Sequence, residues 1–231
     1  MSDNASTLTD RRLTTPRAAA MAGILFALLL IAAYILIRIS IPANPADGGA
    51  WLEERGSTVA LALSLVPIAG IAFLWFIGVI RDRMGQLEDK FFSSVFFGSG
   101  LLFLAMTFVA AALAGGLLTS YAIIPTELID SGLYTFIRTV MYRISNIYAI
   151  RMAGVFMISL ATISVRTRIM HRGLAFLTYG LALVLLFSIG YSLWVTLIFP
   201  AWVLIISVYI LVLNLRSKAA TTEGDQAIMV G

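Results

Sequence analysis

The sequence predicts an all-α polytopic membrane protein: a bundle of six transmembrane helices with an outer-face amphipathic helix before the fourth span. Composition, apolar run length and the placement of basic residues predict it. Of 231 residues, 60% are hydrophobic and 12% are charged. Apolar runs long enough to cross a hydrocarbon core of about 30 Å recur along the chain. Such a sequence is typical of a membrane protein, not of a soluble domain with a large core.

Six apolar segments define a membrane domain over residues 18–216, between polar stretches 1–17 and 217–231 that we expect to be disordered. We predict the spans at 18–41, 57–80, 91–120, 147–165, 173–194 and 198–215. The turn between the last two is placed near 196–200, because a proline such as Pro200 is tolerated in a first helical turn. A break at 190–192 is the second choice, since it leaves the fifth span too short.

Basic residues orient this bundle. Eleven of the 16 Lys and Arg residues lie on the side of the two termini, and five lie on the other side, namely Arg38, Arg55, Arg138, Arg143 and Arg151. Because cytoplasmic loops are enriched in Lys and Arg, we expect both termini in the cytoplasm and the protein in the plasma (inner) membrane. Arg38 is then an anchor at the far headgroups.

Partners follow from the same distribution of charge. The lipid bilayer is the first partner, and a membrane protein or a second copy of the chain is the next to consider. The net charge of +4 forms no patch on a soluble face, so we expect no binding to nucleic acid.

The stretch from Thr126 to Arg166 holds the least ordinary chemistry. Thr126 is predicted to cap a helix that follows Pro125. Apolar residues then recur at helical spacing, and polar ones gather on the opposite side. The apolar stripe is Ile129, Leu133, Ile137, Val140 and Ile144, and the polar side is Glu127, Ser131, Arg138, Tyr142 and Ser145. This pattern predicts a helix lying along the interface, which becomes a span after Ile147.

Arg151 interrupts that span. It lies about 22 Å from Arg166 at 1.5 Å per residue, which places it several ångströms inside the outer boundary of the core. Either it snorkels to the outer headgroups, or it is buried against a carboxylate or beside a cavity for an anion. The candidates for ligand binding or ion pairing are Arg138, Arg143, Arg151, Glu53, Glu54, Glu127 and Asp130. We expect one of these four carboxylates to hold Arg151.

Residues that membrane enzymes use are scarce. The chain has no cysteine, which excludes disulfides and thiol chemistry. Its one histidine, His171, lies in a charged loop, so it offers no haem ligand within a span and no second zinc ligand. Lys90 and Lys218 lie at span ends, and no pair of carboxylates lies within a span. The sequence therefore predicts a non-catalytic protein with no cofactor and no metal.

Two functions remain. The first is an accessory or interaction subunit, a sealed bundle whose small residues pack helices closely; Ala111 with Gly115 and Ala112 with Gly116 are the pairs expected at such contacts. The second is a small transporter, a channel, or a binder of an anionic or lipophilic ligand that uses the outer-side arginine cluster, and it requires a polar cavity open to the outside. Low intramembrane polarity slightly favours the first.

The predicted topology is tested with reporter fusions. Fusions after Arg172 and after Lys218 should read as cytoplasmic, and fusions near Gly49 and Ser131 as external, because of the asymmetry in basic residues. An external reading at Lys218 would contradict the even number of spans.

Overall fold

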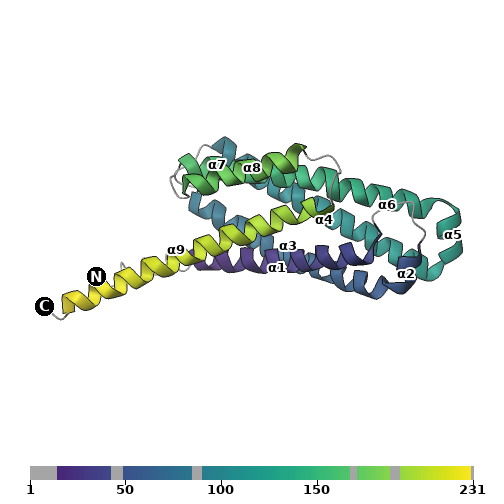
Figure 1. Ribbon diagram of the computed structural model, residues 1–231, viewed down its shortest axis with the longest axis horizontal. Helices are drawn as coiled ribbons and strands as arrows, with labels where there is room; N and C mark the ends of the chain where they lie inside the picture. The colour runs from purple at the N-terminus through teal and green to yellow at the C-terminus, as the bar shows by residue number, and fades with distance from the viewer. Residues whose placement is uncertain (1–14, 43–48, 85–89, 167–170, 188–192, 230–231) are drawn as a thin grey trace, which may run out of the picture.

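The structure, a computed structural model, describes residues 15–42, 49–84, 90–166, 171–187 and 193–229. Within these ranges it is helical throughout and has no strand (Figure 1). The elements in chain order are α1 (Thr15–Ser40), α2 (Ala50–Glu54), α3 (Gly56–Met84), α4 (Lys90–Ile123), α5 (Pro125–Asp130), α6 (Leu133–Arg143), the π-helix η2 (Ile144–Ala149), α7 (Ile150–Arg166), α8 (Arg172–Phe187), the 3₁₀-helix η3 (Leu193–Leu197) and α9 (Ile198–Met229).

The prediction of an all-helical membrane protein is confirmed at the level of class. Five helices in the described ranges are long and apolar enough to cross a membrane, namely Arg17–Ser40, Gly56–Arg81, Phe91–Ile123, Leu133–Arg166 and Trp194–Leu215. A sixth apolar helix, α8, has 16 residues and so extends about 24 Å, which is less than the core thickness. The count of six spans therefore stays a prediction.

The turn predicted near 196–200 is wrong. These residues are helical, because η3 ends at Leu197 and α9 begins at Ile198. Pro200 is the third residue of α9, where a backbone N–H would have no intrahelical partner, so it needs no turn before it. The preceding helix already ends at Phe187, short of the predicted 194, and residues 188–192 lie outside the described ranges.

The long helices pack side by side in a bundle (Figure 1). Helix α9 lies against α1, α1 against α3, α3 against α4, α4 against α7, and α7 against α8; α9 also touches α7 and α8. One end of the bundle carries α2 and α5 and consists of α1 to α6 alone, and we call it the distal end. At the opposite, proximal end α9 leaves the bundle and continues to Met229, through much of the tail predicted to be loose. Residues 1–14 lie outside the described ranges.

Aromatic side chains fill the proximal half between α1, α3, α4, α7 and α9. Phe26 stacks on Phe73 with ring centroids 4.4 Å apart, and Phe103 lies 4.6 Å from Phe199. Such pairs contribute about 0.5–1.5 kcal/mol each beyond the area they bury. Because lipid tails are as apolar as these side chains, close packing is what holds the helices together here.

Glycines provide the closest helix approaches. A Cβ atom at Gly23 would overlap the Ser207 hydroxyl of α9 and lie 2.7 Å from the Phe76 ring of α3. A Cβ at Gly154 would lie 3.1 Å from the Ala182 carbonyl oxygen of α8. A side chain at Gly23 would therefore displace Ser207 and Phe76, and one at Gly154 would require α8 or Leu186 to move slightly.

The pairs of small residues predicted on α4 do not lie at such close contacts. Ala112 is exposed, and a Cβ at Gly116 would have no atom within 4 Å in the described part of the chain. The nearest atom to Gly115 belongs to Leu63, at 3.9 Å. The expected contact at Ala112 and Gly116 is therefore not formed between helices of one chain. A contact there with a second molecule stays a prediction.

Gly23→Ala tests the packing of α1. We expect it to lower the melting temperature of the detergent-solubilised protein, because overpacking a tight contact costs about 1–3 kcal/mol. Gly78→Ala is the matched control, since Gly78 lies in α3 with open space around it. That control should leave the melting temperature unchanged or slightly higher. Equal melting of Gly23→Ala and wild type would contradict the close approach of α1 to α9.

Candidate functional site

A cavity of about 130 Å³ lies in the distal half of the bundle, between α1 and the α6–η2 segment. Cavities of about 150 Å³ bind benzene, so this one has room for a single ring or a small headgroup. Helices α3 and α4 close its back, and η3 borders it on the proximal side. The polar side chains on its wall are Tyr34, Arg38, Thr107, Arg138, Tyr142, Ser145, Asn146 and Thr196.

Helix length places the cavity at headgroup depth. Along α1, Arg38 lies about 32 Å from Arg17 at 1.5 Å per residue, and Asn146 lies about 30 Å from Arg166 on the neighbouring wall. Both lengths equal the thickness of a hydrocarbon core, about 30 Å. When the proximal arginines Arg17 and Arg166 lie at one membrane surface, the cavity lies at the other.

Arg138 extends from α6 into the interior of the distal end. Its side chain is 3% exposed, and its Nη2 donates a hydrogen bond of 2.8 Å to the carbonyl oxygen of Pro42, just after α1. The guanidinium also lies over the ring of Trp51, with 5.6 Å between Cζ and the ring centroid. A buried cation is tolerated when hydrogen bonds and an aromatic face replace its water. Arg138 thus connects α6 to α1 and α2.

Trp51 is itself fixed in place. Its Nε1 donates a hydrogen bond of 2.8 Å to the hydroxyl of Tyr134, one turn before Arg138 on α6. Both side chains belong to a small apolar core of the distal end that also includes Leu52 and Leu128. The short helix α2 is therefore packed against α5 and α6, and it supports the aromatic face beneath Arg138.

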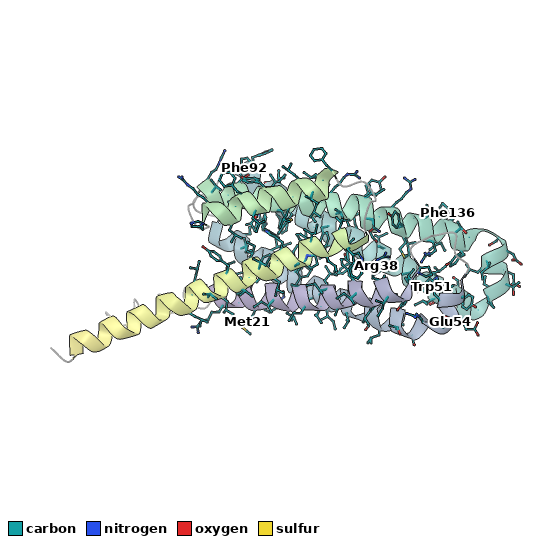
Figure 2. The ribbon with its side chains drawn as sticks, in the orientation of Figure 1. Met21, Arg38, Trp51, Glu54, Phe92 and Phe136 are labelled. Carbon is teal, nitrogen blue, oxygen red and sulfur yellow. The ribbon has the colours of Figure 1, made fainter. Side chains whose placement is uncertain are left out.

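Arg38 approaches the cavity from α1. Its side chain is half-buried, and its Nε is enclosed without a hydrogen-bond partner among the described residues. No carboxylate in the described ranges forms an ion pair with it. Figure 2 shows Arg38 near the level at which α9 begins, and Trp51 farther toward the distal end. Arg38 and Arg138 therefore line the same cavity from different helices.

The wall between α6 and α7 is a π-helix. Ser145 donates to the Met141 carbonyl oxygen at 2.9 Å, and the Asn146 amide donates to the Tyr142 carbonyl oxygen at 3.1 Å. Their side chains thus satisfy backbone acceptors at the start of the wider turn. Isolated π turns occur frequently at functional sites, and this one lines the cavity.

The long amphipathic helix predicted from Thr126 is not observed as one element. Helix α5 begins at Pro125 with no side-chain cap, and Gly132, at φ 74°, separates it from α6. The polar side of α6 is turned partly inward, because Arg138 is buried while Leu133 of the apolar stripe is 44% exposed; Ile137 of the same stripe packs against the distal core. In lipid an apolar side chain gains little by facing inward, whereas a charged one is costly facing outward, so the polar side lines the interior.

The carboxylate partner expected for Arg151 is not observed. Arg151 is half-buried, and the carboxylates of Glu53, Glu54, Glu127 and Asp130 are exposed; in the described ranges none of them pairs with it. They belong to α2 and α5 at the distal end, whereas Arg151 lies about 20 Å proximal to Arg138 along the helix axis. The π-helix also changes the side to which Arg151 points, relative to a continuous α-helix.

Of the seven candidate residues, only Arg138 lines the cavity; Arg143 is exposed on the surface of α6. The sequence analysis assigned Arg38 to headgroup anchoring and so missed its place on the wall. One signal was present, since Tyr34 and Arg38 are four residues apart and share a face of α1. No local pattern indicates that this face is opposite α6.

The comparisons add no relative. No protein-family model, curated protein or solved structure matches the chain. In the ranges that the structure describes, no group of three His, Asp or Glu side chains is placed to hold a metal ion. We therefore infer the function from the chemistry of the cavity alone.

Tyr134→Phe tests the support of Arg138. It removes the acceptor of the buried Trp51 N–H, and leaving such a donor without a partner costs about 1–3 kcal/mol. We expect a lower melting temperature in detergent. Tyr148→Phe is the matched control, because Tyr148 is exposed on η2 and should melt like wild type. Equal melting of the two variants would contradict the Trp51–Tyr134 hydrogen bond.

Proposed function

We propose that the protein is a non-catalytic integral membrane protein that binds an anionic ligand in the distal cavity. The observation that carries the proposal is the wall itself, which Arg38 and Arg138 both line while none of its described residues is Asp or Glu. A guanidinium presents planar N–H donors that match the oxygens of a carboxylate or a phosphate. Arg38 is half-buried and has no carboxylate partner in the described ranges, so its guanidinium is the group that we assign to the anion.

Binding is better supported than conduction. Proximal to the cavity, the interior is occupied by buried aromatic side chains, among them Phe103 and Phe199 with centroids 4.6 Å apart. Helix α9 lies against α1 and touches α7, so it covers the seam between those helices. A ligand in the cavity would thus meet a packed core and not a continuous pore. The accessory-subunit hypothesis predicts a sealed bundle, so the cavity supports it less.

Orientation belongs to the same proposal. With both termini in the cytoplasm, as the basic residues predict, the cavity lies at the outer surface of the plasma membrane. The proximal ends of α1 and α7, with Arg17 and Arg166, then lie at the cytoplasmic surface. The ligand would reach its site from outside the cell or from the outer leaflet.

Thermal stabilisation of the purified full-length chain tests anion binding. Sodium phosphate and dioctanoyl phosphatidic acid are each added in detergent, with sodium chloride at equal ionic strength as the salt control. We expect at least one of the two to raise the melting temperature, because a ligand at 100 times its Kd stabilises by about 2.7 kcal/mol.

Arg38→Gln should abolish this rise, and Arg38→Lys should weaken it, because lysine keeps the charge without the planar fork. Arg143→Gln, which removes an exposed arginine outside the cavity wall, should retain it. An absence of stabilisation by both probes, or an equal rise in Arg38→Gln, would overturn the proposed function.

A further inference from the structure

We infer that the ligand is the phosphate headgroup of an anionic membrane lipid, which enters the cavity sideways from the leaflet at the distal end. The inference rests on the proposed function, because it specifies the source and class of the anion bound there. Depth, the lateral opening and the size of the cavity carry it independently of one another.

Depth comes first. The cavity lies about one hydrocarbon thickness from the proximal arginines along both α1 and the α6–α7 segment. Leu63, on the α3 wall, lies about 27 Å from Arg81 by the same measure. Arg38, Asn146 and Leu63 thus lie near the level where lipid phosphates of that leaflet are concentrated, while Tyr34 and Val66 extend the cavity toward the hydrocarbon. A soluble anion would have to be captured at the same level from dilute solution.

The opening is lateral. Helix α1 packs on α3 and α9, and α6 packs on α4, α5 and η2, so α1 and α6 make little direct contact. Helix α9, which covers α1 farther down, begins only at Ile198. Beyond that point, none of the described long helices covers the seam between α1 and α6. Arg38, Tyr142 and Asn146 line the cavity there and are each half-buried.

Apolar surface continues from the opening. On α1, Ile39 is adjacent to Arg38 and is 55% exposed, and Ile35 lies one turn closer to the hydrocarbon on the same face. A lipid whose phosphate lies in the cavity could therefore lay its acyl chains along this face. Arg38 and the exposed isoleucines of α1 are therefore adjacent, as are the headgroup and the acyl chains of a lipid.

Size then selects the headgroup. A cavity of about 130 Å³ that admits one ring cannot also hold acyl chains, so these must remain in the bilayer. Tyr142 adds a hydroxyl donor for a phosphate oxygen to the guanidinium of Arg38. A choline headgroup would be cationic beside Arg38, which has no carboxylate partner in the described ranges. Phosphatidic acid therefore fits better than phosphatidylcholine.

Native mass spectrometry of the full-length chain in mild detergent tests the inference. Dioleoyl phosphatidic acid and dioleoyl phosphatidylcholine are compared at equal concentration, so that the acyl chains are identical. We expect one phosphatidic acid adduct per chain, at least ten times more abundant than the phosphatidylcholine adduct. Arg38→Gln should reduce it about tenfold, and Arg143→Gln should leave it unchanged. Sodium phosphate in excess should not displace it.

Each contrary outcome is distinct. Equal adducts with the two lipids, or an undiminished adduct in Arg38→Gln, would mean that lipid binds the outer surface without the cavity, and would overturn the inference. Displacement by sodium phosphate, together with stabilisation by sodium phosphate alone, would identify a soluble anion as the ligand. That result would support the proposed anion binding and contradict the inference that the anion is a lipid headgroup. An absence of any adduct and of any stabilisation would overturn both.

Discussion

The distal end of the protein depends on how one buried cation, Arg138, is accommodated. Its hydrogen bond to the Pro42 carbonyl oxygen and its position over Trp51 connect α6 to two segments that are far away in the sequence. A buried charge is costly unless such partners replace water, so the chain must bring them to it. The Trp51–Tyr134 hydrogen bond and the packing of α2 are parts of the same arrangement. Arg138 also lines the cavity, so the same residue that connects α6 to the end of α1 forms part of the wall between them.

The class of fold was accessible from the sequence because membrane thickness acts directly on composition. A helix that crosses about 30 Å of hydrocarbon must be apolar over about 20 residues, whatever its neighbours are. Helix starts near Gly56 and at Ile198 were predicted within about two residues for this reason. The end of α8 was not predicted, because an apolar run shows where a helix can form and not where it stops.

The site was harder to predict from the sequence. In lipid, the side of a helix that faces inward is decided by tertiary packing and not by the local pattern. In water the apolar stripe of α6 would have been buried; in the bundle Leu133 is exposed and Arg138 is inside. For the same reason a small-residue spacing does not identify its own neighbour. Ala19, Gly23 and Ala27 repeat the spacing of Ala112 and Gly116, yet only the first set is buried.

Helix α9 joins the two ends of this arrangement mechanically. Thr196, in the 3₁₀-helix that leads directly into α9, lies on the cavity wall, and α9 then runs for 32 residues to Met229. A straight helix of that length is a rod of about 48 Å. A rod pivoting near its middle moves its two tips in opposite directions, and a tilt of about 5° displaces each by about 2 Å. One end of this rod follows directly on the cavity wall, and the other extends beyond the proximal end of the bundle.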